Sequence, residues 1–576
     1  MTTPSRRDRL RPVELLGISA IIAVFTGLVV LFSTRELQLA VIFLGIAFIV
    51  VVVVLAMLQL ASSSDQDDND MLGGHKTRVK ETATTSTESR AARALPSRRP
   101  FQGDPDLPRR YRHRYLILAV CCMSLFIVSM DATVVNVALP SIGRELDSTI
   151  SGLQWTIDAY TLVLASLLML SGSTADRIGR RTTFQIGLAL FTVGSLLCSL
   201  APGVGWLVVF RMVQAVGGSM MNPVAMSIIT ATFDDARERA RAVGIWGAVV
   251  GVSMGLGPLV GGALTDTIGW RAIFWINVPI GVAAIVLTFL FVPESKSPKP
   301  RRLDPLGQVL VIVLLATLVG GLIEGPRLGW TSPAALGLFV LAAASLAVLV
   351  AVERRRREPL VDVRFFRSIP FSSAVVTAIA AFGANGAFLF LNALYLQEVR
   401  GMSPFEAGLW TLPAAVATMV LSPVSGRLVG SVGSRVPLVL AGIGVGGAGA
   451  ILTTIDAHTP MWVLVVAFVL FGFGFGMVNA PITNTAVSGM PRAQSGSAAA
   501  VASTSRQTGV SLGVALAGTV TGASAVASVG AGFAVATHAM WWIVVGIGAG
   551  ILVVGFVSTS AAAKRSVAGI AHLLDG

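Results

Sequence analysis

The sequence predicts an all-α polytopic membrane protein, and two observations support this fold class. Of the 576 residues, 54% are hydrophobic and 13% are charged, whereas a soluble protein carries about 25% charged residues. Apolar runs recur along the chain, and each is long enough to cross roughly 30 Å of hydrocarbon as a helix. These features exclude a soluble enzyme, a secreted disulfide scaffold and a disordered protein.

Residues 1–60 are predicted to form a two-helix membrane hairpin. The apolar run at 13–32 follows several arginines, as in a signal peptide, but no small-residue cleavage site follows and a second run begins at residue 37. Residues 61–113 are acidic, then rich in Ser and Thr, then basic, with too few apolar residues to fold alone. We interpret them as a disordered cytoplasmic linker whose basic end lies along anionic lipid; a nucleic-acid-binding tail is the less favoured alternative.

Fourteen further apolar runs are predicted to span the membrane as helices. Each is about 18–26 residues long. The thirteenth is rich in Ala, Gly, Ser and Thr and has the weakest apolar signal. The runs lie near residues 115–138, 150–171, 182–200, 204–229, 240–264, 271–292, 304–324, 333–352, 371–396, 405–429, 436–455, 460–485, 497–520 and 538–560.

The basic residues of the loops predict the orientation of these spans. If the residues before the first span are cytoplasmic, the only basic residues of the outer loops are Arg144, Arg271, Arg327 and Arg400. The inner loops and tail hold many more, among which we count Arg506. Retention of positive loops in the cytoplasm produces such a split. The membrane therefore explains the formal net charge of +13 without a nucleic-acid partner.

The loop after the second span carries a specific motif. Gly172 and Gly179 permit a tight turn with close backbone approach. Asp176 can cap the next helix or pair with an arginine, so the loop can act as a latch on the cytoplasmic side. A plain basic loop is the alternative. The residues that form the motif, Gly172, Asp176, Arg177, Gly179, Arg180 and Arg181, resemble the loop signature of the major facilitator superfamily, between its second and third helices.

The fifth span carries a second motif of small residues. Small residues four positions apart let two helices touch backbone to backbone, and Pro258 permits a bend. Ordinary helix packing would also use such spacing. The full set, Gly251, Gly255, Gly257, Pro258, Gly261 and Gly262, resembles the motif in the fifth helix of exporters of the same superfamily. The resemblance favours export over uptake.

Further segments at 130–140, 211–218, 269–271 and 277–279 extend the resemblance to roughly residues 114–560. Together with fourteen spans they resemble the fourteen-helix drug:proton antiporter family, from which the N-terminal hairpin departs. An internal repeat agrees with this, because one constant shift places Ser171 on Ser425 and Asp131 on Asn385. Parallel repeats are a transporter architecture with a central site between the halves.

The resemblance implies the major-facilitator-type fold of two six-helix bundles with two inserted central helices. We place the first bundle at 114–292 and the second at 370–563. The inserted helices and their cytoplasmic loops lie between them, at 293–369, and a cytoplasmic tail follows at 564–576.

Three charged residues lie at one depth within the predicted spans. Asp131, Asp158 and Arg211 lie roughly 10–12 Å below the outer surface, at about 1.5 Å per residue. Charges inside a membrane are costly and mark ion or substrate paths by default. We expect a proton-coupling cluster in which a cationic substrate, or loss of the arginine contact, decides whether a carboxylate holds a proton. By resemblance, Arg211 is a coupling residue. The alternative is a permanent ion pair that only fixes helix packing. For Asp158, proton coupling and a purely structural role are about equally favoured.

Polar and aromatic side chains within the spans are candidates for a substrate cavity. Aromatic rings can stack on flat or cationic compounds, although packing in the core or against lipid is the commoner role. The candidates are Asn136, Trp155, Tyr160, Asn385, Phe388 and Asn392. Glu324, at the outer end of the seventh span, is interpreted as a solvated helix-end carboxylate.

Other classes of site find no support in the sequence. The histidines lack metal-ligand spacing, and no Gly-rich phosphate loop followed by Lys and Ser or Thr is present. The three cysteines lie within apolar runs, which argues against a disulfide framework. We expect no enzymatic activity, no ATP, no metal and no cofactor, only a small amphipathic substrate, protons and the bilayer as partners of a monomer.

We therefore expect a proton-coupled exporter of amphipathic or cationic drugs, dyes or antibiotics, working by alternating access. It would lie in the bacterial inner membrane with both termini cytoplasmic. An exporter of a native lipid or metabolite is the second hypothesis, and a non-transporting membrane sensor or scaffold is the third. The buried Asp131 argues against the third, because a scaffold has no need of a costly buried charge.

Overall fold

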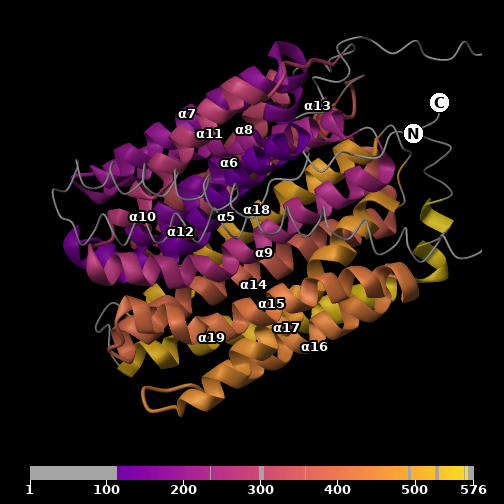
Figure 1. The fold of residues 1–576 in the computed structure, drawn as a ribbon. Helices are drawn as coiled ribbons and strands as arrows, with labels where there is room; N and C mark the ends of the chain where they lie inside the picture. The colour runs from indigo at the N-terminus through magenta and orange to yellow at the C-terminus, as the bar shows by residue number, and fades with distance from the viewer. Residues whose placement is uncertain are drawn as a thin grey trace, which may run out of the picture.

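The computed structural model describes residues 113–233, 235–297, 304–356, 359–488, 490, 494–525, 531–563 and 565–567. The predicted hairpin at 1–60, the linker at 61–113 except its last residue, and most of the tail at 564–576 lie outside these residues. Within the described part every regular element is a helix, and the long helices lie side by side (Figure 1).

We name the helices that precede residue 292 the N-terminal bundle. Two of them begin at side chains that accept a backbone N–H, Thr149 for the second helix and Asp235 for the fifth. The helices are α5 (Arg114–Glu145), α6 (Ile150–Ile178), α7 (Arg180–Ser199), α8 (Val204–Thr232), α9 (Ala236–Thr267), α10 (Ala272–Trp275) and α11 (Asn277–Phe291).

The remaining helices are an inserted pair and a second bundle, which we name the C-terminal bundle. Ser403 begins one of its helices with a capping box. The inserted pair is α12 (Pro305–Leu328) and α13 (Pro333–Glu353), followed by the short η2 (Val363–Arg367). The C-terminal bundle contains α14 (Ile369–Leu394), η3 (Tyr395–Val399), α15 (Pro404–Val432), α16 (Arg435–Leu452), α17 (Met461–Ser488), α18 (Ser495–Ala525) and α19 (Ala531–Val557).

Thirteen helices of the described part are long and apolar enough to cross a membrane, by length and composition. The predicted span at 497–520, which has the weakest apolar signal, is not among them. A helix of 31 residues nevertheless lies there, α18. It packs against α14 and α6, so neighbouring helices cover much of it.

The internal repeat is visible in the packing of the two bundles. In the N-terminal bundle α5 packs against α9 and α6 against α8; in the C-terminal bundle α14 packs against α18 and α15 against α17. The shifted serines make matching buried contacts. The Ser171 hydroxyl lies 3.1 Å from that of Ser219, and Ser425 donates to the Met477 carbonyl at 2.8 Å. Two similar bundles therefore face each other, as the fold class predicts.

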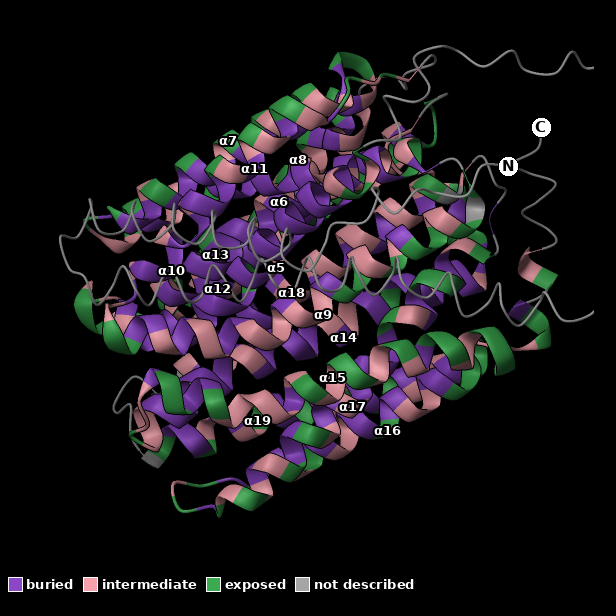
Figure 2. Ribbon diagram, in the orientation of Figure 1, coloured by how far each residue is buried: buried purple, intermediate pink, exposed green. Residues whose placement is uncertain are grey.

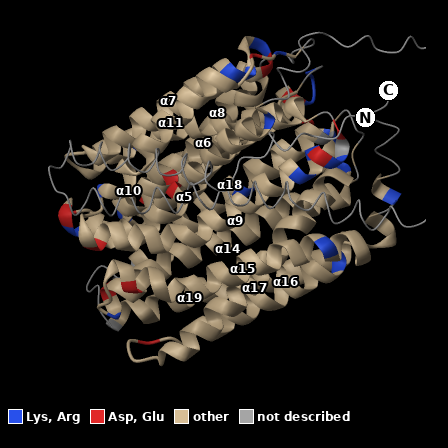
Figure 3. Ribbon diagram, viewed as in Figure 1, with Lys and Arg blue, Asp and Glu red and all other residues tan. Residues whose placement is uncertain are grey.

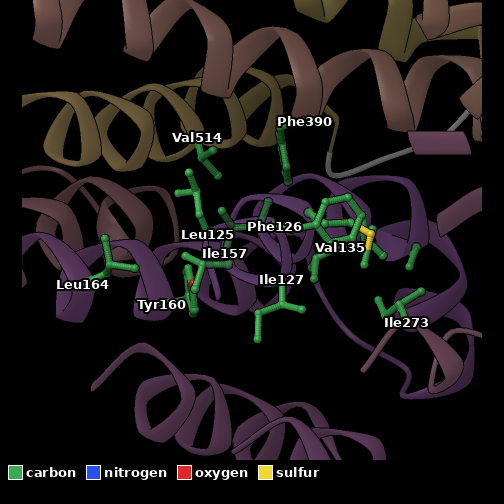
Figure 4. Close-up of a cluster of buried hydrophobic side chains, with 14 of the residues drawn as sticks. Leu125, Phe126, Ile127, Val135, Ile157, Tyr160, Leu164, Ile273, Phe390 and Val514 are labelled. Carbon is green, nitrogen blue, oxygen red and sulfur yellow. The ribbon is translucent and has the colours of Figure 1, made fainter. Parts of the chain in front are cut away.

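The bundles meet along two seams, one between α6 and α18 and the other between α9 and α15. Between the seams α5 packs against α14, and one apolar cluster runs across the contact. Figure 4 shows Phe390 and Val514 of the C-terminal bundle beside Leu125, Phe126 and Ile157 of the N-terminal bundle. This apolar contact brings the two bundles together around the region that holds the charged site.

Polar ties between the bundles lie at the ends of the helices that we predict to face outward. Arg144 pairs with Glu398 at 2.7 Å. The Gln397 amide donates to the carbonyl of Val137 at 2.8 Å, and the backbone N–H of Phe405 donates to the carboxylate of Asp266 at 2.9 Å. The predicted outer ends are thus fastened to each other.

The inserted pair covers the α6–α18 seam. The amide of Gln308 on α12 donates to the carbonyl of Ser166 on α6. Thr519 on α18 donates to the carbonyl of Leu322 on α12 at 2.7 Å. Because α12 is bonded to one helix of each bundle, it bridges the seam from outside.

Burial and charge follow the pattern of a membrane protein. Buried residues line the contacts between helices and exposed ones lie on outward faces (Figure 2). Charged residues lie mostly near the two ends of the helices, with few in the middle (Figure 3). The few charged residues in the middle therefore define the candidate site.

Candidate functional site

Asp131 lies within α5, and only 2% of the residue is exposed. The guanidinium of Arg211 on α8, itself 1% exposed, forms an ion pair with carboxylate oxygen Oδ2. The other oxygen, Oδ1, accepts hydrogen bonds from the amides of Gln214 at 2.8 Å and Asn277 at 2.9 Å. A buried ion pair is stable only when its remaining polar atoms are also bonded. Both carboxylate oxygens of Asp131 meet this condition.

A hydroxyl on a fourth helix ties the two amides together. Ser195 on α7 accepts from Gln214 at 2.6 Å and from Asn277 at 3.2 Å. Arg211 also donates to the side-chain oxygen of Gln214 at 2.7 Å. We call these residues, Asp131, Ser195, Arg211, Gln214 and Asn277, the coupling cluster. They come from α5, α7, α8 and α11, so a shift of any of these helices changes the bonding of Asp131.

The orientation of Arg211 is fixed by α6 as well. Its Nε donates to the backbone carbonyl of Thr156 at 3.3 Å. Its guanidinium carbon lies 4.1 Å from the ring centroid of Tyr160 and 5.8 Å from that of Phe274. An arginine held over aromatic faces gains cation–π attraction, and more so when desolvated. The arginine is therefore oriented by contacts on several sides of its planar group.

The expectation that Asp158 joins this cluster was wrong. Thr156 and Tyr160 are one turn apart and face Arg211, so Asp158, midway between them, points to the opposite side of α6. It is fully buried against α18, near Ser511. Thr161 lies 3.5 Å from its Oδ1, whereas Asp158 Oδ2 and Ser511 Oγ make no hydrogen bond within 3.5 Å among the described residues.

Sequence analysis found the pair of Asp131 and Arg211 but missed Gln214, Asn277 and Ser195 as its partners. Two signals were available. Gln214 lies one turn from Arg211 on the same helix, and Asn277 stands in one of the segments that carry the family resemblance. Ser195 has no comparable signal, because a small hydroxyl residue in a membrane helix usually bonds its own backbone.

The predicted latch is held by a residue that sequence analysis missed, Glu294, just after α11. Its carboxylate accepts the backbone N–H groups of Arg181 at 3.1 Å and Thr182 at 3.2 Å, and the hydroxyl of Thr182 at 2.6 Å. Partial burial raises the pKa of Glu294, but these hydrogen bonds outweigh it and the pKa lies below its ordinary value of 4.5. The carboxylate thus caps the positive end of α7.

Two glycines of the latch behave differently. Gly179 has a φ of +121°, a backbone conformation that favours glycine, and a Cβ there would lie 2.5 Å from the Glu294 carboxylate and displace it. Gly172 is different, because an added Cβ would meet nothing within 4 Å. The close approach expected at Gly172 is therefore not present in this structure. Asp176 pairs with Arg180 one turn on, at 3.4 Å, as the motif suggested.

The small-residue helix α9 touches both bundles. A Cβ on Gly261 would lie 3.0 Å from the backbone oxygen of Val134 on α5. On another face, a Cβ on Gly262 would lie 2.5 Å from the backbone oxygen of Pro404, and one on Gly408 would lie 2.3 Å from that of Pro258. Such contacts need residues without side chains. The motif therefore sets the distance of α9 from both its own bundle and the opposite one.

Comparison with known proteins decides the family. The model of the Major Facilitator Superfamily matches residues 121–514, which include the coupling cluster, the latch and α9. The chain belongs to the major facilitator superfamily. Membership of this superfamily agrees with the buried charges and the paired bundles described above.

Curated relatives of this major facilitator protein are drug-efflux and resistance proteins. Multidrug resistance protein Stp of Mycobacterium tuberculosis is 37% identical over 71% of this chain and 76% of its own length. The tetracenomycin C resistance and export protein of Streptomyces glaucescens is 35% identical over 70% and 74%. The multidrug efflux pump LfrA of Mycolicibacterium smegmatis is 33% identical over 73% and 83%.

A solved structure shares the fold of this major facilitator protein. It is a bacterial homologue of the human lysosomal transporter Spinster, crystallised in an inward-facing and unoccupied conformation. The TM-score is 0.51, with 18% sequence identity, and the match covers 80% of this chain and 98% of that one. At this identity the likeness establishes the fold alone.

The transporter does not gather the candidate cavity residues at one place. Phe388 stacks on Phe471 with centroids 4.0 Å apart and also contacts Phe468 and Trp541, all within the C-terminal bundle. It is a packing residue of that bundle. Tyr160, by contrast, lies against Arg211 and so belongs beside the coupling cluster.

The three candidate asparagines are all buried. The amide groups of Asn136 and Asn392 donate to carbonyls of their own helices, at 3.0 and 2.8 Å. Asn385 occupies on α14 the position that Asp131 occupies on α5. These bonds to the local backbone give Asn136 and Asn392 a structural role here, and their contact with substrate stays a prediction.

Glu324 is more than a solvated helix end. Its carboxylate accepts the indole N–H of Trp155 at 2.9 Å and the hydroxyl of Ser151 at 3.1 Å, both on α6. Arg327 pairs with it from the same helix at 2.8 Å. The candidate Trp155 is thus engaged in fastening the inserted pair to the N-terminal bundle.

Proposed function

We propose that this protein is a proton-coupled antiporter that exports amphipathic or cationic drugs, dyes or antibiotics by alternating access. The observation that carries the proposal is the buried coupling cluster, in which one carboxylate has an arginine and two amides around it. The names of the relatives support drugs as cargo over a native lipid or a sensor role. The bacterial inner membrane, with both termini cytoplasmic, is the proposed location.

The proposed cycle follows from the bonding of Asp131. In the described conformation the carboxylate is neutralised by Arg211 and needs no proton. When the bundles rock and the helices of the cluster shift, Asp131 loses donors, and a buried carboxylate without partners is stable only once it takes up a proton. Proton uptake from one side and release to the other then accompany each passage of substrate. The proton gradient is the only driving force proposed, without ATP, a metal or another cofactor, in a monomer.

Transport in inverted membrane vesicles tests this proposal. Uptake of ethidium, or of the acidic dye 1-anilinonaphthalene-8-sulfonate, should collapse when the pH gradient is dissipated. Asp131→Asn should abolish gradient-driven uptake while exchange of dye without a gradient continues, because the site remains but cannot titrate. Asp147→Asn, in the exposed loop after the same helix, is the matched control. Gradient-independent uptake of both dyes, or a fully active Asp131→Asn, would contradict the proposal.

A further inference from the structure

Arg506 lies inside the helix α18, which occupies the predicted span at 497–520, and not in a loop, which corrects its assignment from the sequence to the inner-loop cations. The helix α18 begins at Ser495, so Arg506 lies roughly 16 Å along it at about 1.5 Å per residue. Its Nη2 donates to the Thr483 hydroxyl at 2.6 Å, and its Nη1 lies 3.5 Å from the hydroxyl of Ser503. Its Nε has no hydrogen-bond partner among the described residues.

The contrast with Arg211 shows what Arg506 lacks. Arg211 has a carboxylate in contact with its guanidinium, whereas both hydrogen-bond partners of Arg506 among the described residues are neutral hydroxyls. In the part of the chain that the structure describes, no ion pair joins Arg506 to an acidic residue within 4.0 Å. A charge in a membrane helix is costly unless something neutralises it. A transient anion is the partner that would complete this site.

The surroundings of Arg506 combine aromatic and polar groups. Its guanidinium carbon lies 5.8 Å from the ring centroid of Phe382, and that ring packs against Phe475 at 5.1 Å. Phe475, Asn479 and Thr483 follow at four-residue spacing and so share one face of α17. Asn479 and Thr483 are exposed. Two exposed polar groups beside an arginine fit contact with water better than contact with lipid tails.

We propose that Arg506 receives the acidic group of the transported compound, while Phe382 and Phe475 pack against its aromatic or apolar body. The substrate class is then an amphiphile that carries a carboxylate, sulfonate or similar anion beside a flat ring system. Asn479 and Thr483 supply hydrogen bonds next to that anion. This inference rests on the proposed function, and it selects acidic amphiphiles within the broad range given there; lipophilic cations bind this site more weakly because Arg506 repels them.

Binding of two dyes with one aromatic frame tests the inference. 1-Anilinonaphthalene-8-sulfonate and N-phenyl-1-naphthylamine differ by the sulfonate group alone. Their Kd values are measured by fluorescence on the purified full chain in detergent, with empty micelles subtracted. The sulfonate should bind more tightly than the neutral dye. Arg506→Gln should weaken sulfonate binding about tenfold or more, as expected for loss of a charge-assisted hydrogen bond, and leave the neutral dye unchanged.

Two further variants make the result decisive. Arg506→Lys keeps the charge and should retain most of the preference for the sulfonate, which a variant that merely fails to fold would not. Arg427→Gln removes an exposed arginine from α15 and should change neither Kd. Equal weakening of both dyes by Arg506→Gln, or no change in the Kd of the sulfonate, would overturn the inference. Proton-driven uptake in vesicles would be unaffected by that outcome, so the two proposals fail separately.

Discussion

The two buried aspartates of the N-terminal bundle differ in what surrounds them. Asp131 is bonded to an arginine and two amides, whereas Asp158 has hydroxyl groups beside it and an oxygen without a partner among the described residues. The same residue type at the same depth is thus placed in two unlike environments by the face of the helix on which it lies. The proposed cycle therefore uses Asp131 and not Asp158.

Among the single residues of the coupling cluster, we predict that Asn277 positions the carboxylate of Asp131. Replacement by Ala removes a hydrogen bond to a charged group, which contributes about 1.5–3 kcal/mol. We expect gradient-driven dye uptake to fall about tenfold or more, while exchange without a gradient continues. Thr288→Val on the same helix is the control, because its hydroxyl bonds only its own backbone. Equal loss of both activities in Asn277→Ala would indicate damaged folding instead of damaged coupling.

Among the helices, the latch depends on a contact between segments far apart in the chain. Glu294 follows the sixth span, yet its carboxylate caps the helix that begins at Arg180. The latch loop is therefore closed onto the end of the bundle by one exposed carboxylate. A carboxylate with a lowered pKa stabilises the folded protein above its unfolded pKa, and this contribution is lost as pH falls through the folded pKa.

We therefore predict a pH-dependent effect of Glu294→Gln. At neutral pH the variant should be destabilised by roughly 0.5–1 kcal/mol, a figure reduced from that of a buried cap because solvent screens an exposed group. Below the folded pKa of Glu294 the two proteins should unfold alike, since the wild-type side chain is then neutral too. Thermal unfolding in detergent at both pH values measures this. A difference that persists at acidic pH would show that charge is not the cause.

Most of the long helices were predictable from the sequence because thirteen of those in the described part are long apolar runs. The predicted span at 371–396 appears as α14 and η3, and the weak run at 497–520 appears as α18. What could not be predicted was which side chains meet. Glu294 reads as a loop carboxylate until the fold brings it to α7, and the direction in which Asp158 points depends on where α8 and α18 pack around α6.

The prediction that placed Arg506 in a loop was wrong for a different reason. The sequence-based orientation counted it among the inner-loop cations, although it lies inside the predicted span at 497–520. The packing of α18 between α14 and α6 compensates for its weak apolar character. A helix that is buried among other helices can carry serines, threonines and an arginine that a lipid-facing helix cannot.

For the whole molecule, the ties between the bundles predict that transport requires the predicted outer ends to separate. We expect that a reducible thiol-specific cross-linker between Arg144→Cys and Glu398→Cys, which replace an ion pair across the bundles, will stop dye uptake and that reductant will restore it. The native cysteines are buried and should react slowly. Each single-cysteine variant, treated in the same way, is the control. Full uptake by the cross-linked protein would show that these ends stay together.

The bridge that α12 makes from α6 to α18 has a consequence for the surrounding lipid. The inserted pair covers the seam between α6 and α18. No described helix covers the other seam, between α9 and α15. Among the described helices, a lipophilic compound in the bilayer therefore meets an uncovered contact between the bundles only along α9 and α15. The described helices thus present two different seams to the bilayer, even though the two bundles repeat each other.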